Sequence, residues 1–140
     1  MNKIFIASDH AGFSLKRYII KNFSKKEKLV DLGPKSDTSV DYPDFAKKLS
    51  KKVSTKKGSF GILICGSGMG MSMAANKTKN IRAALCFSVK NTQLSRLHNN
   101  ANIITLGSRL ISKKKAFNLT KIFLNTKFEG GRHLRRIKKI

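Results

Sequence analysis

Short apolar runs that alternate with helix-like segments constrain the fold of this chain more than any other feature of its sequence. Five runs predict strands, at 4–7, 29–32, 60–65, 83–87 and 103–106. None of them alternates between apolar and polar residues, which is typical of strands buried on both faces of a parallel sheet. Helical patterns lie between them, at 14–23, 43–53, 71–77, 89–99 and 113–124. The alternation predicts an α/β domain with helices covering both faces of the sheet.

The length of 140 residues suits one domain, which we place at 1–140 because no linker or internal repeat interrupts the pattern. Residues 131–140 predict a short basic helix beyond the main alternation. The N-terminus shows no signal-peptide pattern, and no stretch approaches the roughly 18 apolar residues that a membrane span needs. The two cysteines, Cys65 and Cys86, both lie in apolar runs. They suit a reducing compartment, so we expect a cytoplasmic protein that does not bind membranes.

The formal net charge of +23 invites a nucleic-acid-binding interpretation. Its distribution favours a lysine-rich solvated surface instead. Phe45, Leu49 and Val53 form a helical apolar stripe, and the lysines at 47, 48, 51 and 52 lie off that stripe. Stacking platforms for bases would need aromatic residues among the basic ones, yet the chain has no Trp and two Tyr. We therefore expect no specific nucleic-acid partner, and a basic nucleic-acid-binding module remains a remote alternative.

Polar residues follow three of the predicted strands at the point where each strand ends. Residues 8–12 follow the first strand, 65–70 end and follow the third, and 107–109 follow the fifth. Ligands of open α/β sheets bind beyond the carboxyl ends of the strands. The sequence therefore predicts a site at this edge of the sheet.

The loop Cys65-Gly66-Ser67-Gly68-Met69-Gly70 is the strongest local signal. Its glycines allow a tight turn whose amides face an anion. It does not match a Walker phosphate loop, because Met71 stands where Lys is needed. It does not match a dinucleotide fingerprint either, because the third glycine comes one place early and no acidic residue follows about 20 residues on.

The thiols, histidines and arginines leave several possibilities open. Cys65 fits an inert buried thiol or a reactive one equally well from spacing alone, and the neighbouring helix start favours a thiolate. Cys86 has no such loop, so we interpret it as core. Arg132 and Arg136 are four residues apart and would share a helix face suited to a phosphate, although a solvated basic tail explains them as well. The three histidines are His10, His98 and His133.

Seven segments together resemble ribose-5-phosphate isomerase of the B type, in the family that also holds galactose- and allose-6-phosphate isomerases. The matching residues run in order along the chain, at 7–12, 41–43, 64–70, 74–77, 95–99, 107–109 and 129–133. The resemblance implies a three-layer Rossmann-like domain with a five-stranded parallel sheet and a C-terminal helical extension. It also implies a homodimer or dimer of dimers with active sites at subunit contacts, a phosphosugar substrate, and neither a metal nor another cofactor.

The resemblance further implies interconversion of ribose 5-phosphate and ribulose 5-phosphate through a cis-enediolate. Cys65 would transfer the proton between C2 and C1, and His98 would help to open the sugar ring. The loop from Gly66 to Gly70, with the Ser67 hydroxyl, would stabilise the enediolate. The full set of substrate contacts that the resemblance implies is Asp9, His10, Gly66, Ser67, Gly68, Met69, Gly70, Asn99, Arg109, Arg132 and Arg136.

Two departures from some relatives bear on these roles. Some members carry a glutamate base at the position of Met71, and a thioether cannot accept a carbon-bound proton, so the role stays with Cys65. Ser67 replaces a threonine and keeps the hydroxyl.

A six-carbon sugar phosphate is the alternative substrate. The galactose enzyme divides its catalytic residues between two unlike subunits, whereas Cys65, His98 and the arginines stand here in one chain, which favours the ribose type.

Overall fold

The computed structural model describes residues 2–140 and confirms the predicted alternation. Its strands and helices follow one another in the order β1 (Ile4–Ser8), α1 (Phe13–Asn22), β2 (Leu29–Asp31), α2 (Tyr42–Thr55), β3 (Phe60–Cys65), α3 (Met69–Ala75), β4 (Ala83–Leu85), α4 (Val89–Leu97), β5 (Ile103–Gly107), α5 (Lys113–Asn125) and α6 (Arg132–Ile137).

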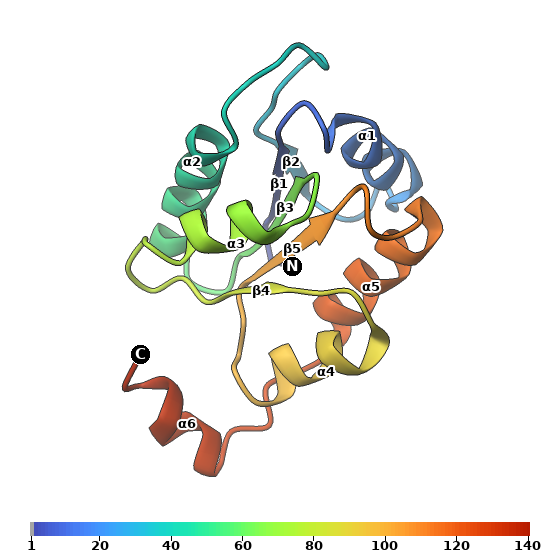
Figure 1. Ribbon diagram of the computed structural model, residues 1–140. Coiled ribbons are helices and arrows are strands. Elements are labelled where there is room, and N and C mark those ends of the chain that lie inside the picture. The colour runs from blue at the N-terminus through green and yellow to red at the C-terminus, as the bar shows by residue number, and fades with distance from the viewer. Residues whose placement is uncertain (1) are drawn as a thin grey trace.

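All five strands are parallel and form one sheet in the order β2-β1-β3-β5-β4 (Figure 1). The three central strands β1, β3 and β5 are buried almost throughout, which explains their unbroken apolar sequence. In the register, Ser8 lies opposite Ile64 and Cys65 lies opposite Gly107. The carboxyl ends of these three strands are therefore level with one another.

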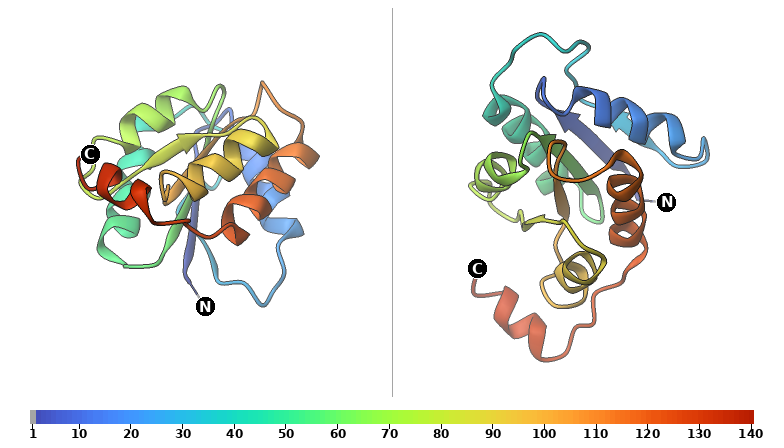
Figure 2. Two further views of the ribbon diagram at one scale, coloured as in Figure 1. Left: turned by 90° about the horizontal axis from the view of Figure 1, so that it is seen from below. Right: turned by 45° about the vertical axis from the view of Figure 1, so that its right-hand side comes forward.

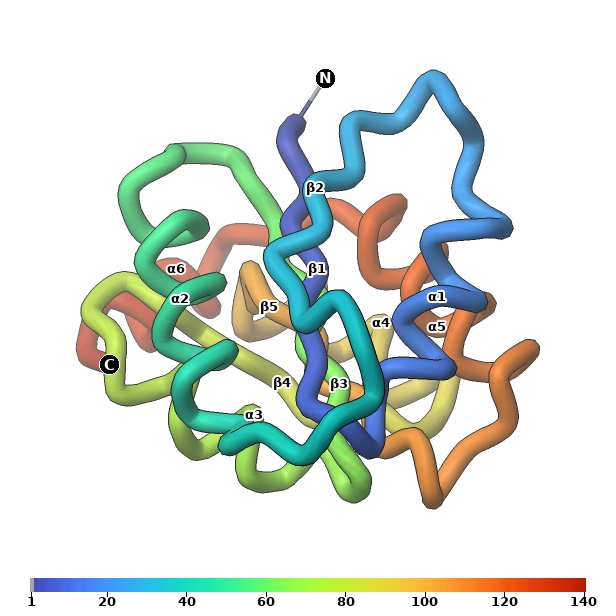
Figure 3. Tube along the Cα trace, turned by 90° about the horizontal axis from the view of Figure 1, so that it is seen from above, coloured from blue at the N-terminus to red at the C-terminus, as the bar shows by residue number. Residues whose placement is uncertain are grey.

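The hydrophobic core has two parts, one on each face of the sheet. On one face α1 and α5 contribute buried residues such as Leu15, Ile19 and Phe123. On the other face α2 and α3 contribute Leu49 and Met71 among others. Figure 3 shows these helix pairs on opposite sides of the strands. The three-layer Rossmann-like arrangement expected from the resemblance is thus confirmed.

The lysine-rich helix faces are solvated, as their spacing predicted. In α2, Leu49 and Val53 are buried, whereas the lysines at 47, 48, 51 and 52 are exposed. The lysines at 113–115 are likewise exposed at the start of α5, next to the buried Ala116. Cys86 is buried in the core, which confirms its predicted place.

Most element boundaries shift by one or two residues from the prediction, and two of these shifts have a clear local cause. The strand predicted at 83–87 ends at Leu85, because Ser88 and Asn91 form a reciprocal cap at the start of α4 and Asn91 also binds the Leu85 carbonyl. Helix α3 begins at Met69, two residues earlier than predicted, because Gly68 adopts a left-handed conformation with φ of 76° and turns the chain there.

The predicted short basic helix at the C-terminus is α6. It lies beside the end of α4 and outside the layers around the sheet (Figures 1 and 2). Within residues 2–140, no helix is both long enough and apolar enough to cross a membrane.

Candidate active site

The residues that follow β1, β3 and β5 meet around one hollow, as their positions predicted. This hollow has a volume of about 390 Å³, and its lining residues are Asp9, Tyr42, Cys65, Gly66, Ser67, Gly70, Arg109 and Leu110. Cys65 ends β3, Asp9 follows β1 and Arg109 follows β5. Three loops that are distant in sequence therefore build one site at the carboxyl edge of the sheet.

The Cys65 thiol is held at the entrance of the glycine loop. The Gly68 backbone N–H donates a hydrogen bond to Cys65 Sγ over 3.1 Å. Behind the loop, the amides of Ser108 and Arg109 donate to the carbonyls of Cys65 and Gly66 over 2.9 and 3.0 Å. The hydrogen bond therefore fixes the sulfur at the start of the loop, where Cys65 lines the hollow.

Two glycines of the loop have no room for a side chain. A Cβ on Gly68 would lie 2.9 Å from the Leu106 carbonyl carbon, and the residue's φ is +76°. A Cβ on Gly70 would lie 2.6 Å from the Tyr42 ring. These contacts press the loop against β5 on one side and against the start of α2 on the other, which fixes where its amides lie.

Ser67 and Met69 complete the loop in different ways. The Ser67 hydroxyl accepts a hydrogen bond from the Met69 N–H over 3.2 Å and lines the hollow. The Met69 side chain is exposed and is not among the lining residues. Met71 is fully buried in the core beneath the loop, so the position that carries glutamate in some relatives offers only packing here.

Asp9 and Tyr42 line both this hollow and a second one, which His10 also lines. The Asp9 carboxylate accepts a hydrogen bond from the Gly12 N–H over 3.0 Å and lines both spaces. The second hollow, of about 550 Å³, is lined by His10 and the segment from Ser39 to Asp44. His10 Nδ1 lies 3.2 Å from both the N and the O of Val40, so either ring tautomer is held by that residue.

Four predicted site residues lie at the other edge of the sheet: His98, Asn99, Arg132 and Arg136. Helix α4 leads from the carboxyl end of β4 back to the amino end of β5, which places its last residues far from Cys65. The two arginines are exposed on α6, beside the end of α4. One copy of the chain therefore does not bring these residues to the Cys65 hollow.

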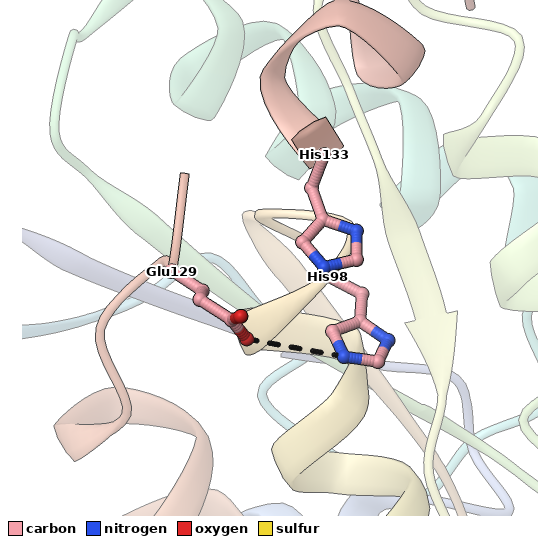
Figure 4. Close-up of side chains that lie close together, drawn as sticks. All are labelled: His98, Glu129 and His133. Carbon is pink, nitrogen blue, oxygen red and sulfur yellow. Dashed lines mark ion pairs between the residues drawn. The ribbon is translucent and has the colours of Figure 1, made fainter. Parts of the chain in front are cut away.

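The His98 ring has two close neighbours at this edge. It stacks on His133 with ring centroids 4.2 Å apart, and its Nε2 lies 4.0 Å from a carboxylate oxygen of Glu129 (Figure 4). Burial, the nearby His98 and Arg132 lower the pKa of His133, and Glu129 opposes that shift. A larger hollow of about 600 Å³ also lies at this edge, but it contains none of the predicted catalytic residues.

Two lining residues had no role assigned from the sequence, Tyr42 and Leu110. Tyr42 packs its ring over Gly70, which only the folded structure reveals. Tyr42 directly precedes Pro43, and a first-turn proline marks the start of a helix. The sequence could therefore have placed Tyr42 at the start of α2, next to the site. Leu110 gave no signal, being one apolar residue in an ordinary loop.

Comparison with known proteins decides the family. The model of the ribose/galactose isomerase family matches residues 4–140. The chain belongs to that family. It is 49% identical over 142 aligned positions to a probable ribose-5-phosphate isomerase B of Mycoplasma genitalium, covering 98% of this chain and 92% of the relative.

Two solved structures of family members are also similar to this fold. Ribose 5-phosphate isomerase B of Thermotoga maritima superposes with a TM-score of 0.95 and 50% identity, over 99% of this chain and 96% of that one. The Mycoplasma genitalium enzyme, solved with bound ribulose-5-phosphate, gives a TM-score of 0.91 and 47% identity, over 98% and 92% of the two chains. The family resemblance inferred from the seven segments is therefore confirmed.

Proposed function

We propose that this protein interconverts D-ribose 5-phosphate and D-ribulose 5-phosphate, with Cys65 as the proton-transfer base. The observation that carries the proposal is the Gly68 N–H aimed at Cys65 Sγ inside the hollow. Asp9 is the one carboxylate among the lining residues, and its oxygen is already bound by the Gly12 amide. The thiol is thus the lining group best prepared to accept a carbon-bound proton. The names of the similar proteins support this substrate.

The proposed reaction moves one proton between two carbons. The Cys65 thiolate removes the proton from C2 of the open-chain aldehyde, and the electron pair of that C–H bond forms the C1–C2 double bond of a cis-enediolate. A proton passes from the oxygen on C2 to the oxygen on C1. The Cys65 thiol, whose proton can exchange with solvent, then protonates C1, which leaves the ketone at C2. Amides of the Gly66–Gly70 loop and the Ser67 hydroxyl stabilise the negative charge of the intermediate.

Substrate recognition in this proposal uses the residues around the two connected hollows. Asp9 accepts hydrogen bonds from sugar hydroxyls, and Arg109, whose guanidinium lies against Gly66, closes the pocket. His10 lies in the adjoining hollow, where it would bind the phosphate. The two spaces share Asp9 as a lining residue, which suits an extended phosphosugar that occupies both.

We further propose that a second copy of the chain completes each site. Four residues with proposed roles lie at the edge of the sheet opposite Cys65 of the same chain. They are His98 for ring opening, Asn99 for a sugar hydroxyl, and Arg132 and Arg136 for the phosphate. A two-fold dimer can bring one copy's far edge to its partner's hollow, and it does so twice by symmetry.

Mixing two inactive variants tests this arrangement. Cys65→Ala and His98→Asn chains, co-expressed in equal amounts, form mixed dimers with one intact site each. Statistical mixing should restore about a quarter of wild-type activity. If the mixture stays as inactive as the separate variants, each site is built from one chain and the dimer proposal is wrong.

The alternative substrate is a six-carbon sugar phosphate, because the family's description names galactose beside ribose. Comparing kcat/KM for ribose 5-phosphate, allose 6-phosphate and galactose 6-phosphate with purified protein decides between them. Ribose 5-phosphate should exceed both hexose phosphates by at least about ten-fold, since pocket contacts worth 1.4 kcal/mol suffice for that ratio. Higher turnover of either hexose phosphate would contradict the proposed substrate.

A further inference from the structure

Three side chains that commonly bind metals meet at the edge of the sheet opposite Cys65. His98 directly follows α4, Glu129 lies in the segment between α5 and α6, and His133 belongs to α6. One donor atom from each lies within 4.8 Å of the other two. Figure 4 shows both rings and the carboxylate gathered in one place. Nothing in the proposed reaction uses Glu129 or His133.

His133 is the buried member of the cluster. Its exposed fraction is 6%, and its Nε2 has no hydrogen-bond partner among residues 2–140. A buried polar nitrogen without a partner is destabilising, and such an atom points to a water or an ion as its partner. This observation is independent of the distances between the three side chains.

The donor set selects the class of ion. Two imidazoles with one carboxylate suit Zn²⁺ and neighbouring first-row divalent ions, and leave positions open on the metal. Alternative sites are scarce, because the chain has seven acidic residues against thirty basic ones. The resulting net charge of +23 disfavours nonspecific accumulation of cations.

Binding one ion requires a small rearrangement. Donors at about 2.1 Å from an ion are at most about 4.2 Å apart, so the cluster has to contract. His98 and Glu129 can move, because their side chains are 38% and 51% exposed. The two rings are inclined by only 14°, and the lone pair of an imidazole nitrogen lies in the ring plane. The His98 ring must therefore rotate out of the stack, whereas His133 stays in its buried place.

We propose that His98, Glu129 and His133 form an inhibitory site for a divalent transition-metal ion such as Zn²⁺. The inhibition rests on the proposed function, in which His98 opens the sugar ring in the partner's hollow. An ion bound to the His98 nitrogen removes the lone pair that moves the proton and turns the ring away. The bound ion thus lowers turnover by withdrawing His98 from the partner's hollow, and it needs no contact with Cys65.

Co²⁺ titration of the purified full-length protein tests the site directly, because the absorption spectrum separates nitrogen and oxygen ligands from thiolate. We expect one ion per chain without a thiolate charge-transfer band. Glu129→Gln should weaken binding at least about ten-fold, since it removes the anionic ligand of the set. Glu27→Gln is the matched control, because Glu27 is exposed, is the only other glutamate and should keep wild-type affinity.

The outcomes separate the site from its effect. Equal Co²⁺ affinity of the two glutamine variants, or a thiolate band that persists in both, overturns the site. His98→Asn gives a second test at a half-exposed position and should weaken binding like Glu129→Gln. Zn²⁺ should inhibit the wild type and the Glu27→Gln variant at least about ten-fold more strongly than the Glu129→Gln variant. If Co²⁺ binds as expected but Zn²⁺ does not inhibit, the inhibitory role is wrong and the ring-opening role of His98 is contradicted with it.

Discussion

An alanine at Gly68 adds one methyl group at the most constrained point of the loop. The new Cβ would lie 2.7 Å from Leu85 Cδ1 and 2.9 Å from the Leu106 carbonyl carbon. The Leu85 methyl can rotate away. Leu106 cannot retreat, because it belongs to β5, which is paired with β3 on one side and β4 on the other. The loop itself must therefore move, and with it the Gly68 amide that donates to Cys65.

The expected loss of stability has two parts. An alanine in the left-handed region costs about 1–2 kcal/mol, and overpacking against a fixed backbone costs about 1–3 kcal/mol. Together these lower the free energy of unfolding by roughly 2–5 kcal/mol. With an unfolding entropy of about 2.1 cal/mol/K per residue, a chain of 140 residues should lose about 7–17 °C in Tm.

Gly58→Ala is the matched control for Gly68→Ala. Its φ of +80° is close to the +76° of Gly68, but its Cβ would meet only the Asn2 side chain at 3.4 Å, an ordinary contact. This variant should lose about 3–7 °C in Tm and keep its turnover. Thermal unfolding at matched protein concentration, together with phosphosugar turnover, measures both variants. Equal losses of Tm in the two, or full turnover in Gly68→Ala, would refute the steric reasoning.

Three further predictions follow from other parts of the structure. Lys16→Met should lower the free energy of unfolding by about 1–3 kcal/mol in urea titrations. Lys16 is buried, and its Nζ donates to Asp31 at 2.8 Å and to the Pro34 carbonyl at 2.6 Å. A loss below about 0.5 kcal/mol, as for an ordinary surface change, would contradict this expectation. Ser88→Ala should cost about 1 kcal/mol by the same assay, since it removes the side-chain cap of α4, and no change would show that the cap is dispensable. Burial raises the pKa of Cys86, so this thiol ionises less readily than an ordinary cysteine. Iodoacetamide should therefore label Cys65, which lines the open hollow, before Cys86, as peptide mass analysis can verify; preferential labelling of Cys86 would contradict this expectation.

Much of the fold could be predicted because its signals are local. The strand at 60–65 was placed at its observed bounds, since an unbroken apolar run ends there in a glycine loop. Helix α2 could be located from the Phe45, Leu49 and Val53 stripe and from the first-turn proline. The boundary errors arose where a cap or a left-handed residue, rather than hydrophobic periodicity, decides the end of an element.

The candidate site divides in the same way. Asp9, Cys65 and Arg109 could be brought together in advance, because carboxyl ends of parallel strands share one edge. The ring of Tyr42 over Gly70 could not, since that contact depends on how α2 packs against α3. The stack of His98 on His133 joins the residue that follows α4 to a residue of α6, and no local pattern encodes the relative placement of these two helices.

Deuterium exchange at C2 of ribose 5-phosphate, followed by proton NMR in heavy water, tests the central role of Cys65 most directly. The Cys65→Ala variant should fold, because the thiol is replaced by a smaller apolar side chain at the end of a buried strand. It should also lose C2 exchange and ketose formation by at least about a hundred-fold, as expected for removal of a positioned base. Exchange at a rate close to that of the wild type in a folded Cys65→Ala protein would contradict the assignment of Cys65 as the base.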